Sequence, residues 1–190
     1  MFPEAIHRVP GCANDGKIPH VTNWRTVSLD DGVVSLRQWE QADRDDAFRE
    51  PELGRFFGSA ITPSPPVDDD EMPAFAIVLV DSEHVVGKIW CRAGARPPEI
   101  GYYLRRDAWG RGYATRALTL ATDWLLLDAG FTEVELCIHP GNERSHKVAE
   151  RSGYERDGTI EDYAQFKDGT RRALRFVRRG SQPHRERREG

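Results

Sequence analysis

Two glycines near the middle of the chain stand where a predicted strand gives way to a predicted helix. Gly110 and Gly112 follow the strand-like run 99–104 and precede a segment, up to Asp128, whose apolar residues recur at three- and four-residue steps. Glycines let backbone N–H groups converge without obstruction, and a helix N-terminus adds free donors and the positive end of its dipole. The segment therefore predicts a seat for phosphate or pyrophosphate; the alternative is that the glycines serve only a tight turn.

The familiar phosphate-binding motifs fit this stretch poorly. Arg105, Arg106 and Arg111 add positive charge around it, but the chain contains no G-x-x-x-x-G-K-[ST] loop. A dinucleotide fingerprint needs a third small residue at the position of Thr115 and an acid closing the next strand, and that strand ends in His139. A Rossmann-like nucleotide-binding protein is thus the weaker reading.

Three further side chains have types and positions suited to chemistry. Glu99 is the only carboxylate in the strand 99–104, and burial would raise its pKa towards neutrality and make it a proton acceptor; the alternative is a surface glutamate. Asn142 and Ser145 begin a predicted helix over 142–151, where Asn142 also suits an N-cap. His139 precedes Pro140 and fits a structural strand-end histidine better than a base.

The elements that must position these residues follow from periodicity and turn signals. We predict a hairpin from the apolar runs 74–80 and 85–91, a loop over 58–73, and Trp90 and Trp124 in the core. Further strands are predicted over 33–37, 99–104, 134–139, 154–166 and 172–178, and helices over 40–50, 112–128 and 142–151. This order predicts a mixed α/β domain around one sheet.

Composition restricts the class of protein. The 190 residues carry a net charge of −4, which argues against nucleic acid as the main partner. No run approaches 18 apolar residues, so no membrane partner is expected, and residues 1–20 lack the apolar stretch of a secretory signal. Cys12, Cys91 and Cys137 show neither disulfide nor metal spacing. A cytoplasmic protein is expected.

At this point the sequence resembles a known family. The stretch 99–115 looks like the acyl-coenzyme A (acyl-CoA) pyrophosphate loop of the GNAT superfamily of N-acyltransferases. That pattern has Gln or Arg first, Gly fourth and Gly or Ala sixth, and here it lies over Trp109-Gly-Arg-Gly-Tyr-Ala114. Tryptophan departs from the general pattern but is similar to the ribosomal-protein alanine acetyltransferase branch, which often reads W-G-x-G-Y-A-T. Residues 139–154 resemble that branch's P-x-N-x-x-S and V-A-E-K-x-G-F, and 33–39 match more weakly.

The resemblance covers roughly 24–179 and implies a fold and a co-substrate. The fold is α/β, with a single mixed, mostly antiparallel sheet that is splayed between its fourth and fifth strands and flanked by helices. The co-substrate is acetyl-CoA or another acyl-CoA, with no metal. The implied cofactor contacts are Tyr103, Leu104, Arg106, Trp109, Gly110, Arg111, Gly112, Tyr113, Ala114, Thr115 and Asn142. Backbone N–H groups around Tyr103 and Leu104 would hold the pantetheine and polarise the thioester.

The implied reaction is direct attack of a primary amine on the thioester in a ternary complex. Glu99 is the implied catalytic base, acting directly or through water. Ser145 is the implied catalytic hydroxyl near the sulfur. Many family members carry a tyrosine acid just before the E-K-x-G-F segment, but Ala149 stands there in this chain. Ser145 or water must then protonate the thiolate, so the identity of the acid stays open.

The acceptor is the least defined part of this expectation. The segment from Glu40 to Glu71, which the family uses on the amine side, contains ten acidic residues and three arginines. Such a loop is either simply solvated or attracts a cationic amine, which is a small molecule or a protein N-terminus. The alternative function is a non-catalytic acyl-CoA-binding sensor or scaffold. We expect residues 1–24 to be an N-terminal extension, residues 25–180 to form the acyltransferase domain and residues 181–190 to be a disordered tail. A homodimer is one candidate assembly.

Overall fold

The computed structural model describes residues 24–40, 42–43, 74–92, 97–163 and 166–180. Within them, one sheet of eight strands has the order β1-β2-β3-β4-β5-β6-β8-β7. The strands are β1 (Leu29–Asp30), β2 (Val34–Gln38), β3 (Ala74–Leu79), β4 (Val85–Arg92), β5 (Glu99–Leu104), β6 (Glu133–Ile138), β7 (Glu155–Ile160) and β8 (Ala173–Arg179). The helices are α2 (Tyr113–Leu127), α3 (Glu143–Arg151) and two short 3-10 turns, η1 (Trp24–Thr26) and η3 (Arg106–Ala108).

The predicted hairpin, strands and two central helices are confirmed, and several details differ. The predicted strand 154–166 ends at Ile160, because Asp162 adopts a φ of 53° and the chain then turns, with the Tyr163 N–H donating to the Arg171 carbonyl at 2.7 Å. β8 returns between β6 and β7, which no local pattern indicates. Cys12, the predicted helix 40–50 (apart from its first residues), the loop 58–73, most of the N-terminal extension and the tail lie outside the described residues.

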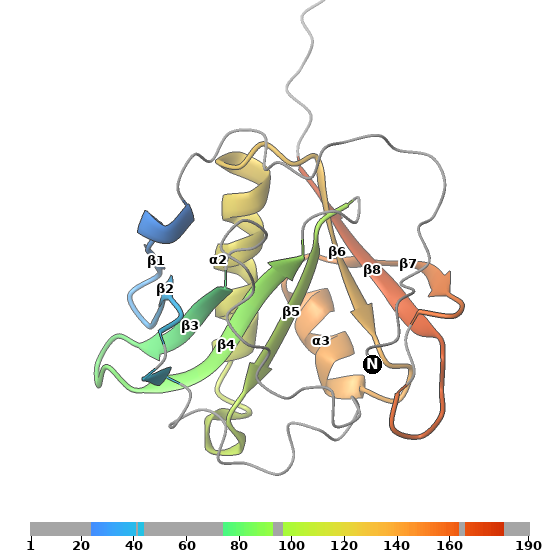
Figure 1. The fold of residues 1–190 in the computed structure, drawn as a ribbon, viewed down its shortest axis with the longest axis horizontal. Helices are drawn as coiled ribbons and strands as arrows, with labels where there is room; N and C mark the ends of the chain where they lie inside the picture. Colours follow the sequence, from blue (N-terminus) through green and yellow to red (C-terminus); the bar gives the residue numbers. More distant parts are fainter. Residues whose placement is uncertain (1–23, 41, 44–73, 93–96, 164–165, 181–190) are drawn as a thin grey trace, which may run out of the picture.

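All neighbouring strands are antiparallel except β5 and β6. These two run parallel and share one registered pair, Glu99 with Glu135. Beyond that pair they separate, and Figure 1 shows them diverging with α3 between them in this view. The expected splay between the fourth and fifth predicted strands is therefore present, at β5 and β6.

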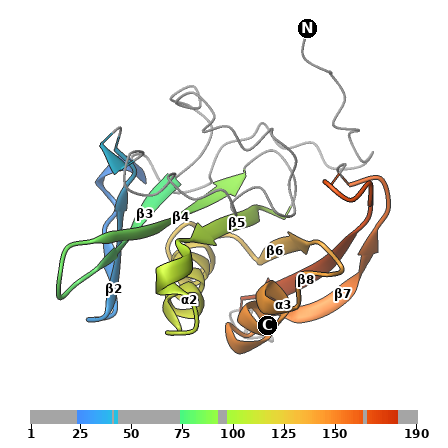
Figure 2. The ribbon, with the colours of Figure 1, turned by 90° about the horizontal axis from the view of Figure 1, so that it is seen from below.

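The main core lies between the sheet and α2. Both helices cover the same face of the sheet (Figure 2), and Trp124 of α2 packs edge-on against Phe75 of β3. α2 ends where Gly130 takes a φ of 77°, and the Phe131 N–H returns to the Leu125 carbonyl at 3.0 Å. Neither described α-helix is long and apolar enough to cross a membrane.

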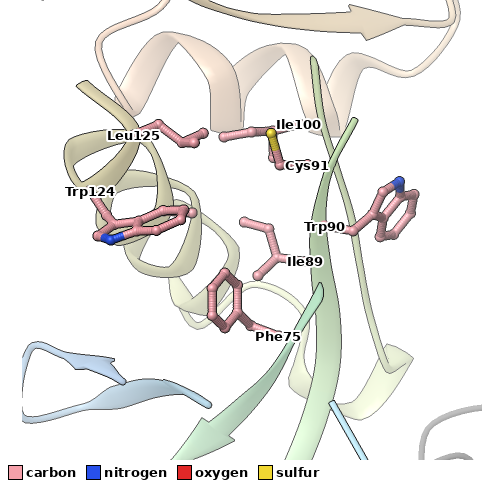
Figure 3. Close-up of a pocket in the computed structure, with 8 residues that line it drawn as sticks. Phe75, Ile89, Trp90, Cys91, Ile100, Trp124 and Leu125 are labelled. Atoms are coloured by element: carbon pink, nitrogen blue, oxygen red, sulfur yellow. The ribbon is translucent and has the colours of Figure 1, made fainter. Parts of the chain in front are cut away.

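The placement of Trp90 in this core was wrong. Trp124 is buried as expected, but Trp90 points away from it to the opposite face of β4, as Figure 3 shows. Its ring lies across Gly101, where an added Cβ would come within 2.4 Å of the indole. Strand alternation explains the outcome, because Ile89 and Cys91 occupy the core side of β4 and Trp90 must face the other way.

Candidate active site

The loop between β5 and α2 has the backbone shape of an anion seat. Gly110 and Gly112 adopt φ values of 75° and 82°, in the left-handed region that favours glycine. A Cβ built at either glycine would meet no described atom within 4 Å, so space lies open beside both. An approaching ligand can therefore reach the backbone there.

The N-terminus of α2 supplies the donors. Gly112 is the N-cap and offers no side-chain acceptor, and the first turn of this fully described helix carries no acidic residue. The N–H groups of Tyr113, Ala114 and Thr115 and the positive dipole end are thus left for an external anion. A diphosphate fits this donor set.

Basic side chains surround the seat to different degrees. Arg106 in η3 and Arg111 in the loop are exposed, whereas Arg105 pairs with Asp107 at 2.9 Å. Arg106 and Arg111 are therefore exposed arginines beside the loop.

Trp109 ties this loop to two other parts of the site. Its indole N–H donates to the carbonyl of Leu104, the last residue of β5, at 2.9 Å. The guanidinium of Arg144, in the first turn of α3, lies 4.6 Å from the centre of the Trp109 ring. The end of β5, the glycine loop and the start of α3 therefore meet around one side chain.

The hydrogen-bond ladder decides which backbone groups of β5 face the splay. The Arg105 N–H donates to the Val86 carbonyl of β4 at 2.8 Å, so alternate residues, Tyr103 among them, direct their backbone groups towards β4. Tyr102 and Leu104 direct theirs towards β6. Of the two positions predicted to hold the pantetheine, Tyr103 and Leu104, it is Leu104 that directs its N–H towards the open edge. The N–H of Tyr102 points the same way.

Glu99 lies at the vertex of the splay and is half-buried. Burial raises the pKa of its carboxyl, and the nearby Glu135 carboxylate raises it further. The hydrogen bond from Tyr163, the nearby Cys137 thiol and the charge of Arg92 oppose that rise in the pKa. The group is thus moved in the direction that a general base near neutral pH requires.

The acidic neighbourhood of Glu99 is balanced by an arginine. The Glu99 and Glu135 carboxylates and the Cys137 Sγ lie within 4.8 Å of one another. Arg175 of β8 donates to Glu135 at 2.6 Å, so a guanidinium compensates this carboxylate. Cys137 and Cys91 are buried free thiols, as predicted.

The first turn of α3 holds the other predicted polar residues. The Asn142 side chain accepts a hydrogen bond from the Ser145 N–H at 3.3 Å, which makes Asn142 an N-cap. Ser145 also lies beside the Tyr102 hydroxyl. Burial raises the pKa of Tyr102 to about 12, and Ser145 acts in the opposite direction. The Tyr102 hydroxyl meets no described partner at full hydrogen-bond geometry.

His139 is held at both ring nitrogens. The Gly141 N–H donates to Nδ1 at 2.9 Å, so the neutral ring carries its proton on Nε2, which donates to Asp168 at 3.0 Å. The structural interpretation of this histidine is thereby supported.

Sequence reasoning missed two residues of this site, Tyr102 and Tyr163. Side chains alternate along β5, so Tyr102 lies on the same face as Ile100, towards the helices, and this alternation could have identified it from the sequence. Nothing local points to Tyr163, whose hydroxyl donates to Glu99 from 64 residues further along the chain. A separate small apolar cavity between α2 and β4 lies in the core, and Figure 3 shows apolar side chains around it; none of the predicted site residues lines it.

The predicted residues therefore fall into two groups along β5. The loop residues, Leu104, Asn142 and Ser145 gather around Trp109 and the first turn of α3. Glu99 is at the other end of β5, about 17 Å away along the six-residue strand. The Tyr103 side chain faces away from α2, with its ring centre 6.4 Å from that of Trp90.

Several known proteins are similar to this chain. Among curated proteins, the chain is similar to the uncharacterised N-acetyltransferase p20 of Bacillus licheniformis, with 27% identity over 97 residues, which are 49% of this chain and 54% of that protein. The chain thus spans about half the length of that relative.

Two solved structures share the fold. Mycobacterium smegmatis RimJ in complex with CoA-disulfide has a TM-score of 0.64 and 20% identity, covering 80% of this chain and 86% of that one. The ribosomal-protein-S5-alanine acetyltransferase of Vibrio fischeri has a TM-score of 0.64 and 16% identity, covering 82% and 98%. A family model, the acetyltransferase (GNAT) domain, matches residues 34–155, which include β5, the glycine loop and α3. The chain belongs to the GNAT acetyltransferase family.

Proposed function

We propose that this protein transfers an acetyl group from acetyl-CoA to the primary amine of a small molecule or of a protein N-terminus. The observation that carries the proposal is the arrangement along β5. A carboxylate with a raised pKa stands at the vertex of the splay, and the strand leads from it into an uncapped anion seat. Buried free thiols suit a reducing cytoplasm as the site of action.

The length of β5 supports CoA over a compact nucleotide. The anion seat and Glu99 are separated by about 17 Å of extended strand. A ligand that binds by its diphosphate and reacts near Glu99 needs a long, narrow arm between these two points. The pantetheine arm of CoA has this form, and a mononucleotide does not.

The anion seat has enough donors to hold the diphosphate. The N–H groups of Tyr113, Ala114 and Thr115 and the left-handed Gly110 and Gly112 offer the backbone contacts. The side chains that we propose to contact the diphosphate are Arg106, Arg111 and the amide N–H₂ of Asn142. Trp109 contacts both the end of β5 and the start of α3 and so holds the loop between them.

In the proposed reaction Glu99 takes the proton of the attacking amine, directly or through one water. The N–H group of Tyr102, on the open edge of β5 and nearer to Glu99, donates to the thioester carbonyl oxygen as negative charge develops there, and the N–H group of Leu104 donates to the pantetheine arm. The carbon–nitrogen bond forms and the carbon–sulfur bond breaks. Ser145, or a water beside it, then gives a proton to the leaving thiolate.

The acceptor is proposed by class. Ribosomal-protein acetyltransferases such as the S5-alanine enzyme of Vibrio fischeri share this fold, which makes a protein N-terminus one candidate. The acidic segment 40–71 makes a small polycationic amine the other.

The test is a thiol-release assay with acetyl-CoA and a panel of amines, namely peptides with free Ala or Ser N-termini, polyamines and aminoglycosides. We expect release of CoA with at least one class, and a loss of about a hundred- to ten-thousand-fold in turnover for Glu99→Gln. Acetyl-CoA affinity should hardly change in that variant. Wild-type protein that binds acetyl-CoA but acetylates no amine would favour the non-catalytic sensor.

A further inference from the structure

The β7–β8 connection, of which residues 161–163 and 166–172 are described, reaches the proposed base from outside the strands that frame the splay. Tyr163 lies in this connection, and its hydroxyl donates a hydrogen bond to Oε1 of Glu99. Sequence neighbours of Glu99 do not make this contact. The interaction crosses from the C-terminal hairpin to the start of β5.

The position of Tyr163 is fixed by its own surroundings. Its N–H donates to the Arg171 carbonyl at 2.7 Å, across the connection. Its ring stacks on that of Phe166, with centres 6.2 Å apart and an angle of 25° between the planes. Phe166 is 2% exposed and packs edge-on against His139 at 4.7 Å.

Behind Phe166, the His139 ring is itself clamped by Asp168 and by the Gly141 N–H. Tyr163 and Phe166 join Cys137, Ile160 and Ala173 in a small hydrophobic cluster separate from the main core. A tyrosine anchored in this way is a fixed donor, and its hydrogen bond restricts the rotamers of the Glu99 carboxylate.

The charges that face Glu99 come from three directions. Arg92 of β4 stabilises the carboxylate, and Glu135 of β6 repels it. The Cys137 thiol of β6 lies within 4.8 Å of it, and the Tyr163 hydroxyl donates a hydrogen bond to it. Arg175 of β8 acts on Glu135 rather than on Glu99, since it is 2.6 Å from the Glu135 carboxylate.

We propose that Tyr163 is a positioning residue for Glu99: it holds the carboxylate towards the splay and favours its ionised form, so the β7–β8 connection sets the lower end of the enzyme's pH range. This inference rests on the proposed function, in which Glu99 is the base. The carboxylate is half-buried beside another carboxylate, so without a donor it would stay protonated to a higher pH.

The first experiment compares kcat/KM across pH for wild type and Tyr163→Phe, which keeps the ring and removes the hydroxyl. A hydrogen bond to an ionised group is lost, so the acidic limb should move to higher pH. Below that limb kcat/KM should fall at least about tenfold relative to wild type, with a much smaller loss on the alkaline plateau. An equal loss at every pH, or none, would overturn the proposal.

A second variant protects the test against a folding defect. 3-Fluorotyrosine at position 163 keeps the shape of the side chain and makes the phenol more acidic, hence a stronger donor. It should move the acidic limb to lower pH, opposite to Tyr163→Phe. Tyr154→Phe is the matched control, because it removes another buried phenol hydroxyl, which contacts Thr122 at 2.6 Å, and its acidic limb should coincide with that of wild type.

Carbon-13 NMR of the glutamate carboxyls separates this inference from the proposed function. The Glu99 signal is assigned by its loss in Glu99→Gln and is titrated without substrates. Tyr163→Phe should move that titration to higher pH even if Glu99 proves dispensable for turnover. An unmoved titration, in a protein that Glu99→Gln inactivates, would overturn the role of Tyr163 and leave the base intact.

Discussion

Glu99 of β5 and Glu135 of β6 form the registered pair at which the two parallel strands meet. The Glu135 N–H donates to the Pro98 carbonyl at 2.9 Å, directly before Glu99. After this pair the strands part, and the backbone groups of β5 that alternate towards β6 are Tyr102 and Leu104. The carboxyl at the vertex and the polar backbone along the opening are the groups that the proposed amine acylation uses, and both follow from this one pairing.

Coenzyme A should stabilise the folded protein. At a concentration of a hundred times its Kd, a ligand that binds only the native state adds about 2.7 kcal/mol. For a domain of this size that raises Tm by about 5–10 °C. Differential scanning fluorimetry with CoA, acetyl-CoA, NAD and ATP checks this. Greater stabilisation by NAD than by acetyl-CoA would contradict the assignment of the anion seat.

Gly112→Ala should weaken CoA binding by at least about tenfold, because the new methyl group fills space that the diphosphate needs. The left-handed backbone also makes alanine strained there, by roughly 1–2 kcal/mol. Gly32 is a matched control, since it has the same φ of 82° and equally open space beside it. Gly32→Ala should lower Tm similarly and leave the calorimetric Kd for CoA unchanged. Equal affinity in both variants would move the phosphate seat elsewhere.

Ser145→Ala should lower turnover by a few-fold only, because water can replace the hydroxyl as proton donor. Stability should hardly change, since the capping bond uses the Ser145 backbone N–H and not its side chain. Asn142→Ala, in contrast, removes the cap and should cost about 1 kcal/mol of unfolding free energy. Steady-state kinetics and thermal unfolding of the two variants check this. A loss in Ser145→Ala as large as that in Glu99→Gln would make the hydroxyl the principal acid.

Glu99→Gln should be more stable than wild type above neutral pH. The folded-state pKa of Glu99 is raised, so the folded state binds more protons than the unfolded state between the ordinary carboxyl pKa and the raised one. Wild-type stability therefore falls as pH rises through that window, whereas the amide does not titrate. Each kcal/mol of gain corresponds to about 2–4 °C in Tm.

Urea unfolding of both proteins from pH 4 to 8 checks this prediction. The advantage of Glu99→Gln should vanish at the acidic end, where both states of the wild type are protonated. Glu155→Gln, at an exposed position of β7, is the control that should show no such trend. A variant less stable than wild type at pH 8 would mean that the Glu99 charge is well compensated in the fold.

Local sequence was enough for most of the strands and for the strand–turn–helix around the glycine loop. The period change from β5 to α2, with Gly110 and Gly112 between them, determines a strand–turn–helix because each signal acts within a few residues. The same holds for the Asn142 cap of α3, which is three residues from its donor. The splay came from the family resemblance and not from periodicity.

The surroundings of the proposed base were decided only by the tertiary structure. Glu135 lies beside Glu99 through the pairing of β5 with β6. Arg175 reaches Glu135, and Tyr163 reaches Glu99, because β8 returns between β6 and β7. Burial and neighbouring charge set the pKa of a carboxyl, and both depend on residues far away in the chain. The sequence therefore determined that a glutamate precedes the glycine loop, and the fold alone determined the hydrogen bond and the neighbouring charges that support its proposed role as a proton acceptor.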